Sequence, residues 1–288
     1  MLSIIVCTIR PNLVNKLEES ISRTIGDVDC EILKFDNKKN KYPISKVYNI
    51  CKQKAKYKYC LFVHEDVVFK TKNWGNILID IFNRDKKIGL IGVAGSNYKS
   101  KNPSAFWHVR DENLFINIIQ HYGKDTHTHL KKGFTNNNLE DVVVIDGVFI
   151  ALNKSSNVSF NENLKDFHCY DLAVSIDTIN NNYKVVVTNQ ILIEHFSIGT
   201  TNINFINQVL NFHKLYKNKL PVGAINSSKK LEKYSLERFL EICMQNRYIN
   251  NKLLYKYFFY KPFSKFFFRL LWLKLNLIKS KTNPLEHF

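Results

Sequence analysis

The chain has 288 residues, 45% of them hydrophobic and 23% charged, which is enough to bury a large apolar core and excludes a disordered tail or a short peptide scaffold. Its six cysteines lie far apart and form no C-x-x-C pair, which argues against a structural zinc site or a disulfide framework. The N-terminus lacks the features of a signal peptide, and no apolar run reaches the ~18 residues of a membrane span. These features predict a cytoplasmic protein.

The basic charge of the chain is concentrated near its C-terminus. Lysines and arginines number 42 against 25 acidic residues, a formal net charge of +17. No acidic residue lies between Glu241 and Glu286, and this stretch holds nine basic ones: Arg247, Lys252, Lys256, Lys261, Lys265, Arg269, Lys274, Lys279 and Lys281. About half of the excess is therefore local, which favours one anionic contact surface over a uniformly basic nucleic-acid binder.

Strands and helices are predicted to alternate over the first 93 residues. Continuous apolar runs predict buried strands at residues 2–8, 31–35, 59–63 and 88–93. Apolar residues at helical spacing predict helices at residues 12–25, 45–55 and 74–82. This order predicts an α/β fold with a mainly parallel sheet covered by helices on both faces. Ligands of such sheets bind beyond the carboxyl ends of the strands.

The rest of the chain is less regular. Periodicity fades from residue 95 to residue 140, and a polar stretch of this length predicts a long binding loop or lid. Strand character returns at residues 142–152 and 184–195. Helices are predicted at residues 170–179, 203–217 and 230–245.

Three side chains that can bind a metal ion or accept a proton, two aspartates and one histidine, lie at the ends of predicted strands and helices. Asp66 follows the buried strand at residues 59–63, where a carboxylate can hold Mg²⁺ or Mn²⁺, and His195 ends a second apolar strand, from which it could complete the coordination of the same ion. Asp171 begins a helix, where it could act as a cap or as a general base. Taken singly, each also has an ordinary structural explanation: a solvated turn, a hydrogen-bonded histidine and a helix cap.

A series of segments in a fixed order carries a family resemblance. The segments are SIIVCT, EILKFDN, SKVYNICKQKA, YCLFVHEDV, IGVAGS, VIDGVFIALNK, FNENLKDFHCYDLAVSI and IEHFS. Their order resembles that of the GT-A glycosyltransferases, most closely the bacterial branch similar to family 2, over roughly residues 1–200. The resemblance implies the GT-A fold and a nucleotide-sugar donor, with a UDP-sugar as the first choice.

The resemblance also implies a set of donor-binding residues. Asp36 would contact the nucleobase or ribose, while Lys46 would contact the diphosphate. The other candidates border the nucleotide or lie on the helix before the metal strand: Thr8, Arg10, Asn49 and Glu65.

The metal motif of the family is altered in this chain. The usual Asp-x-Asp reads His64-Glu65-Asp66, so that His64 replaces the first aspartate. Asp66 would hold Mn²⁺ or Mg²⁺, and His195 would match the histidine that some members use as a further ligand.

The base motif is altered as well. Where many members have Glu-Asp-x-Asp-Leu, this chain reads HCYDL, which puts Cys169 at the usual position of the base. A thiol is unsuited to deprotonating a sugar hydroxyl. Asp171 is therefore the first candidate and His168 the second. Asp146 would face the acceptor sugar, and Trp107, within a lid at residues 95–135, would give the sugar ring a platform.

The implied reaction is a metal-assisted, inverting transfer of a sugar to a glycan or lipid-linked acceptor, in the synthesis of a bacterial surface polysaccharide or lipooligosaccharide. The altered metal and base motifs leave a rival hypothesis. In that alternative, the chain is a non-catalytic GT-A-like protein that binds a nucleotide and associates with the membrane.

A catalytic domain is expected at residues 1–222 and a helical extension at residues 223–288. Within residues 252–281, Pro262 breaks an amphipathic pattern. Its basic side contains Lys261, Lys265, Arg269, Asn276 and Lys279, and its apolar side contains Phe263, Phe266, Phe267, Leu270, Leu271, Leu273, Leu277 and Ile278. This pattern favours peripheral attachment to the anionic inner face of the cell membrane. The alternative is packing of the apolar side on the catalytic domain, and no nucleic-acid partner is expected.

Overall fold

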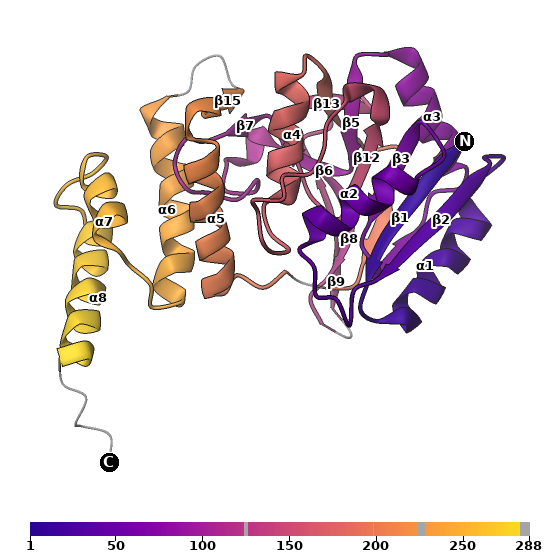
Figure 1. The fold of residues 1–288 in the computed structure, drawn as a ribbon. Coiled ribbons are helices and arrows are strands. Elements are labelled where there is room, and N and C mark those ends of the chain that lie inside the picture. Colours follow the sequence, from indigo (N-terminus) through magenta and orange to yellow (C-terminus); the bar gives the residue numbers. More distant parts are fainter. Residues whose placement is uncertain (124–125, 198, 224–227, 283–288) are drawn as a thin grey trace.

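The computed structural model describes residues 1–123, 126–197, 199–223 and 228–282, with side chains up to residue 278. Its centre is a seven-stranded sheet (Figure 1). The strands follow in this spatial order: β10 (Leu139–Val142), β13 (Lys184–Thr188), β5 (Ile88–Gly92), β12 (Phe149–Asn153), β3 (Tyr59–Val63), β1 (Leu2–Thr8) and β2 (Cys30–Asp36). The last residues of the predicted extension, 283–288, lie outside the described part of the chain.

The strand directions confirm the predicted fold class. Strands β1, β2 and β3 pair in parallel, as do β5 and β13. Strand β12 lies antiparallel between β3 and β5, so those two also point the same way, while β10 is antiparallel to β13. Five of the seven strands therefore share one direction, and their carboxyl ends meet at one edge.

The helices that the structure describes cover both faces of this sheet, and the last of them continue the chain beyond it toward the C-terminus. They are α1 (Pro11–Thr24), α2 (Ile44–Lys54), α3 (Trp74–Arg84), α4 (Tyr170–Asn180), α5 (Ile203–Leu215), α6 (Lys229–Gln245), α7 (Asn251–Phe258) and α8 (Lys265–Thr282). Short 3₁₀ turns lie at Asp111–Asn113, Lys154–Ser156 and Lys217–Lys219.

Alternation along β1 explains why its sequence is apolar at nearly every position. Ile4 and Val6 pack into one core cluster with α1 and α3, whereas Ile5 packs into a second cluster with α2 on the opposite face. A strand covered on both faces cannot alternate between apolar and polar residues. The continuous apolar runs were therefore a sound basis for predicting β1, β3 and β5.

The stretch at residues 95–140, predicted as a long loop, contains strands β6 (Ala94–Ser96), β8 (Leu114–His121) and β9 (His127–Lys132), while residues 100–110 hold no helix or strand. These strands belong to a second sheet with the order β11 (Val144–Ile145), β6, β8, β14 (Ile193–His195) and β4 (Val67–Phe69), and β9 pairs with β8. A separate ladder joins β7 (Tyr98–Lys99) to β15 (Val222–Gly223).

Buried polar residues concealed these strands. Asn117 in β8 donates to the carbonyl oxygen of Asn189 at 2.8 Å, and its side-chain oxygen lies 2.8 Å from the ring of His129. Because these side chains are satisfied inside the protein, β8 can bury polar residues. The same residues weaken the alternating pattern from which a strand is recognised.

Two other predicted strands are each divided in the structure. Residues 142–152 contain β11 and β12, which are separated by Asp146 and Gly147, and residues 184–195 contain β13 and β14. In both cases the chain passes between the seven-stranded and six-stranded sheets. The strands on both sides of each crossing are apolar, so only the short polar pairs Asp146-Gly147 and Asn189-Gln190 mark the change of sheet. Each crossing brings polar residues to the junction of the two sheets.

Helices α5 and α6 pack against each other beside the sheets (Figure 1), and α6 is tied to them by a buried carboxylate. Glu232 accepts hydrogen bonds from the hydroxyls of Tyr98 at 2.5 Å and Ser100 at 2.6 Å, and from the amide of Lys101 at 3.2 Å. Further along α6, Phe239 and Leu240 are fully buried in the same cluster as Ile4. Helix α6 therefore shares the core of the residues before 222.

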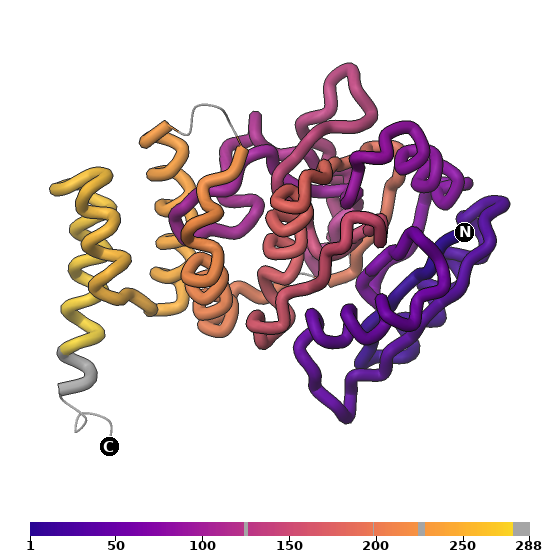
Figure 2. Tube along the Cα trace, turned by 45° about the horizontal axis from the view of Figure 1, so that its top comes forward, coloured from indigo at the N-terminus to yellow at the C-terminus, as the bar shows by residue number. Residues whose placement is uncertain are grey.

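Helices α7 and α8 form the far end of the molecule (Figures 1 and 2). The ring of Phe266 lies 5.2 Å from that of Tyr257, and Phe267 lies 5.5 Å from Phe258. Leu270 is fully buried. This part of the predicted apolar side thus packs on α7, within the predicted extension.

The outer side of α8 carries a different set of residues. Phe268 is 51% exposed and Trp272 is 68% exposed. Lys265 and Arg269 are exposed as well, and Phe268, Arg269 and Trp272 follow Lys265 by three, four and seven positions, which places them on one side of the helix. Aromatic and basic side chains therefore mix on the solvent side. No helix in the described ranges is long and apolar enough to cross a membrane.

Candidate active site

The first element of the site is the end of β1, which Glu65 holds in place. One carboxylate oxygen of Glu65 accepts hydrogen bonds from the Thr8 hydroxyl at 2.5 Å and from the amides of Ile9 and Arg10, both at 3.0 Å. The other oxygen accepts from Nε of Arg10 at 2.8 Å. Burial would raise the pKa of Glu65, but these bonds outweigh it and hold the pKa below its usual value. Glu65 therefore stays charged and fixes the loop after β1.

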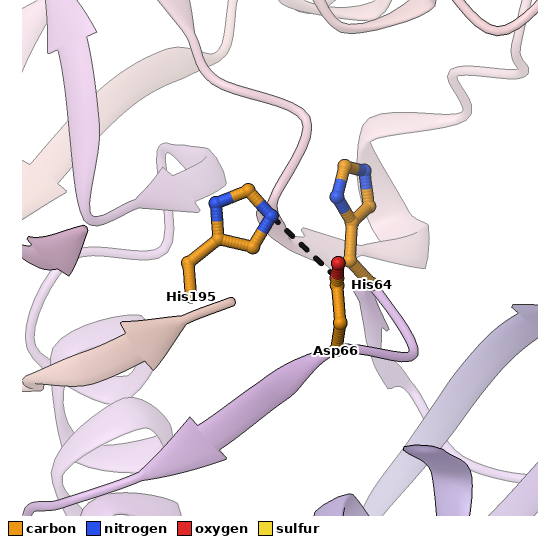
Figure 3. Close-up of side chains that lie close together, drawn as sticks. All are labelled: His64, Asp66 and His195. Atoms are coloured by element: carbon orange, nitrogen blue, oxygen red, sulfur yellow. Dashed lines mark ion pairs between the residues drawn. The ribbon is translucent and has the colours of Figure 1, made fainter. Parts of the chain in front are cut away.

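Three side chains converge beside this loop (Figure 3). His64 and Asp66 follow β3, and His195 ends β14 of the second sheet. Nε2 of His195 lies 3.5 Å from Oδ1 of Asp66, and one ligand atom from each of the three residues lies within 4.8 Å of the others. The junction of the two sheets therefore gathers two imidazoles and one carboxylate, the only such cluster among the described residues.

Asp66 is ionised in this cluster. Burial would raise its pKa, but the hydrogen bonds with His195 and Ser197 and the nearby positive charge hold the pKa well below its usual range. The guanidinium of Arg10 approaches the other oxygen of Asp66 at 3.5 Å. A negative charge at the end of a buried strand is thus maintained by neighbours on three segments.

The donor set fits a divalent metal ion. Imidazole nitrogens suit transition metals, whereas a carboxylate also suits Mn²⁺ and Mg²⁺. The sequence indicated Asp66 and His195 for this position and missed His64. The available signal was the HED string itself, because a histidine that replaces a metal-binding aspartate is also a ligand type.

A cavity of about 180 Å³ lies next to the cluster, at the carboxyl ends of β1 and β3. Its wall includes Arg10, Ile44, Tyr48, His64, Asp66 and Phe167. A second cavity, of about 280 Å³, lies beside β10 and is lined by Arg84, Asp85 and Gln190. Two of the three candidate metal ligands, His64 and Asp66, line the smaller cavity, which is therefore the candidate donor site.

Asp171 lies in the first turn of α4. Its Oδ2 accepts a hydrogen bond from the amide of Gly147 at 3.1 Å, and its Oδ1 accepts one from the amide of Leu172 at 2.9 Å. Burial and the nearby charge of Asp146 raise the pKa of Asp171 to about 7. A carboxylate with this pKa can accept a proton near neutral pH.

The other base candidates are placed less favourably. Burial lowers the pKa of His168, whose ring meets that of Phe205 edge-on at 5.3 Å. Burial raises the pKa of the Cys169 thiol far above its usual value, so the thiol stays protonated. Cys169, at the usual position of the base, therefore cannot perform this role.

The two predicted acceptor residues lie on different segments. Asp146 follows β11, and its Oδ1 accepts a hydrogen bond from the amide of Val148 at 2.9 Å. Trp107 is 41% exposed and stacks on Phe205 at 5.9 Å. Strands β8 and β9 fix two parts of the expected lid at residues 95–135 in the second sheet, whereas Trp107 lies in the strand-free segment between β7 and β8. The rings of Trp107 and His168 both contact that of Phe205.

Four predicted donor residues lie outside the lining of the 180 Å³ cavity, namely Thr8, whose hydroxyl is bonded to Glu65, and three residues of other segments. Asp36, at the end of β2, is exposed, and its Oδ1 accepts from the amide of Lys38. The ammonium of Lys46 lies 4.0 Å above the ring of Tyr42. Asn49 exchanges two hydrogen bonds of 2.9 Å with the backbone of Phe160, so its side chain is occupied in holding that segment.

Comparison with known proteins defines the class. Residues 3–216 match the profile described as "Glycosyltransferase like family". No curated protein matches the sequence. Among solved structures, the crystal structure of S. aureus TarS 1–349 in complex with UDP is similar with a TM-score of 0.52 and 11% identity, and the match covers 100% of this chain and 93% of that one.

Two other solved structures are more distant. GalNAc-T7 with UDP, GalNAc and Mn²⁺ has a TM-score of 0.48 and 11% identity, and the match covers 85% of this chain and only 56% of that chain. PcManGT, a mannosyltransferase from Pyrobaculum calidifontis in complex with GDP-Man and Mn²⁺, has a TM-score of 0.45 and 8% identity, with 98% and 75% covered.

The fold and the profile agree on one class of protein, the glycosyltransferases with a GT-A fold. The profile spans more than half of the chain, and the chain belongs to this glycosyltransferase-like family. The resemblance inferred from the sequence is thereby confirmed, and the protein is a glycosyltransferase.

Proposed function

We propose that the protein transfers a sugar from a nucleotide-sugar donor to a hydroxyl of a glycan or lipid-linked acceptor, with a divalent metal ion bound by His64, Asp66 and His195. The observation that carries this proposal is the convergence of these three side chains, within 4.8 Å, beside the 180 Å³ cavity. Mn²⁺ or Mg²⁺ bound there would supply positive charge to the diphosphate leaving group.

The residues around the cavity have separate roles in this proposal. Arg10 and Thr8, fixed by Glu65, border the nucleotide, and Asp36 contacts its base or ribose. Lys46 adds positive charge at the diphosphate. Asn49 supports the donor site through the backbone of Phe160. A UDP-sugar is the first donor to test, since TarS, which is similar in fold, was crystallised with UDP.

Asp171 is the proposed general base. It accepts the proton of the acceptor hydroxyl while that oxygen attacks the anomeric carbon and the bond to the diphosphate breaks. A single displacement from the opposite side inverts the configuration. The pKa of about 7 supports this role. Asp146 and the exposed ring of Trp107 are proposed to contact the acceptor sugar.

The test is nucleotide release from UDP-, GDP-, CMP- and dTDP-sugars with Mn²⁺, in the presence of saccharide and lipid-extract acceptors. We expect selective turnover of one donor, lost in EDTA and recovered when Mn²⁺ is added in excess. A protein that binds one nucleotide but releases none with any acceptor would instead favour the non-catalytic alternative.

We further infer that the protein works at the anionic inner surface of a bacterial cell membrane, where a lipid-linked glycan of a surface polysaccharide or lipooligosaccharide is extended. Exposed aromatic residues of α7, α8 and the turn between them support this inference. They are Tyr255, Phe259, Phe263, Phe268 and Trp272. Lysines and arginines lie among these rings, and residues 242–285 contain no acidic residue. Aromatic rings enter the headgroup region while basic groups attract anionic lipids.

Replacing both Phe268 and Trp272 by alanine should weaken the binding of the full chain to phosphatidylglycerol vesicles. Burial of one such ring contributes about 2 kcal/mol, so the loss of both, about 4 kcal/mol, should lower the partition coefficient by up to roughly 10³-fold. Vesicle co-sedimentation at several salt concentrations measures this change. Tyr122→Ala, a substitution of a 46% exposed aromatic residue elsewhere, is the matched control. Equal binding to phosphatidylcholine and phosphatidylglycerol vesicles would contradict the proposal.

A further inference from the structure

Tyr170, the first residue of α4, contacts a proposed metal ligand from behind. Its hydroxyl oxygen lies 2.9 Å from Nε2 of His64 and 3.2 Å from the carbonyl oxygen of Gly147. Tyr170 is only 3% exposed. A phenol hydroxyl carries a single proton at neutral pH.

The contact with Gly147 favours one placement of the protons. A carbonyl oxygen only accepts, and in this placement the hydroxyl of Tyr170 donates to it at 3.2 Å. Its lone pair then faces Nε2 of His64, which must carry a hydrogen to make the second bond. In a neutral imidazole this arrangement leaves Nδ1 unprotonated, with its lone pair available to a metal ion.

Gly147 provides the space for this contact. A Cβ atom at residue 147 would lie 2.2 Å from the hydroxyl oxygen of Tyr170, so any side chain would displace it. The amide of Gly147 also donates to Asp171 at 3.1 Å. One glycine thus contacts both Tyr170 and the proposed base.

The same arrangement recurs at the second histidine. Nδ1 of His195 lies 3.0 Å from Oε1 of Gln120. The amide nitrogen of Gln120 donates to the carbonyl oxygens of Ser197 at 2.8 Å and His121 at 3.0 Å, which fixes its oxygen toward His195. Nδ1 of His195 is therefore the nitrogen that donates to Gln120, and Nε2 is the ring atom that faces Asp66, at 3.5 Å.

We infer that Tyr170 is a positioning residue: it holds His64 in the tautomer protonated at Nε2, so that Nδ1 faces the metal position between Asp66 and His195. This inference rests on the proposed metal site. Hydrogen-bonded partners behind a ligand commonly increase metal affinity by 10–100-fold. The hydroxyl of Tyr170 would thus tune the metal affinity from α4, the helix that also carries the proposed base.

The first test is the tautomer of His64 in the metal-free protein, read from its ring ¹⁵N chemical shifts and assigned with the His64→Gln variant. We expect a protonated Nε2 and a bare Nδ1 in the wild type. In Tyr170→Phe we expect a mixture of both tautomers. A protonated Nδ1 in the wild type would overturn the inference even if the variant failed to fold.

The second test is Mn²⁺ affinity, measured by electron paramagnetic resonance without nucleotide. Tyr170→Phe should raise the dissociation constant by about 10–100-fold. The matched control is Tyr59→Phe, which removes a hydroxyl that lies 3.3 Å from Asn83, away from the cluster. Unchanged affinity and an unchanged tautomer in Tyr170→Phe would overturn the inference, whereas a wild type that binds no Mn²⁺ would overturn the proposed metal site itself.

Discussion

Replacing Asp66 by asparagine is expected to reduce kcat/KM by roughly 10³-fold or more. The amide keeps the shape of the side chain but removes the only carboxylate of the ligand cluster. A metal ion typically contributes several kcal/mol of stabilisation to a developing negative charge, and about 4 kcal/mol corresponds to roughly 10³-fold in rate. Nucleotide release at saturating Mn²⁺ measures the loss.

The matched control for this substitution is Asp80→Asn, which changes an exposed carboxylate on α3. It should leave both turnover and Mn²⁺ binding unchanged. The Asp66 variant should also bind Mn²⁺ much more weakly while unfolding at a temperature close to that of the wild type. Full turnover of the Asp66 variant in EDTA would show that the reaction proceeds without the proposed ion.

Replacing Asp171 by asparagine is expected to lower kcat by 10²–10⁴-fold, which is the usual contribution of a general base. The variant should still bind Mn²⁺ and the donor nucleotide, since Asp171 contacts Gly147 and Leu172 and none of the three proposed ligands. Steady-state kinetics together with nucleotide titration separates the loss of chemistry from a loss of binding. Equal losses in both would instead indicate a structural role.

The pKa of Asp171 predicts the pH dependence of the wild type. Only the carboxylate can accept a proton, so activity should rise with pH and level off above about 7. Stability should change in the opposite direction. Because folding raises this pKa above its ordinary value of 3.8, the contribution of Asp171 to stability is full below pH 3.8 and is lost as pH rises through about 7.

The two pH profiles also distinguish the two candidates for the base. In Asp171→Asn, the rise of activity with pH should disappear. Above pH 7, the unfolding temperature of this variant should rise relative to that of the wild type. If the rise instead persisted in Asp171→Asn and vanished in His168→Gln, His168 would be the base. Both profiles use the same buffers, and Asp80→Asn again provides the control.

Much of the first half of the fold could be predicted because its strands are buried on both faces. The strand at residues 59–63 has the predicted bounds, and the helix expected at residues 74–82 ends two residues later, at Arg84. Continuous apolar runs followed by helical spacing carry strong local information. The second sheet could not be predicted in this way, because residues such as Asn117 become suitable for a strand only through partners distant in sequence.

In the candidate site, too, residues at the ends of strands could be predicted, whereas contacts between residues distant in sequence could not. Sequence reasoning assigned Asp66 and His195 to one ion from the ends of their strands, and the structure brings them to 3.5 Å. Their role as ligands stays a prediction. Tyr170 could not have been selected, because its importance depends on a hydrogen bond to His64, 106 positions away. Glu65 likewise looked like a donor-binding residue and is occupied in holding the loop after β1.

The buried Glu232 on α6 sets how the two ends of the molecule are oriented. Its bonds to Tyr98, Ser100 and Lys101 connect α6 to the strand region of the fold, and Tyr257 on α7 donates to Glu237 on α6 at 2.6 Å. On the proposed membrane surface, these links would keep the catalytic cavity at a set height and tilt above the lipids. Whether the end of an acceptor glycan enters the cavity would then depend on the length of that glycan. The enzyme would favour lipid-linked glycans long enough to span the distance between the lipid surface and the cavity.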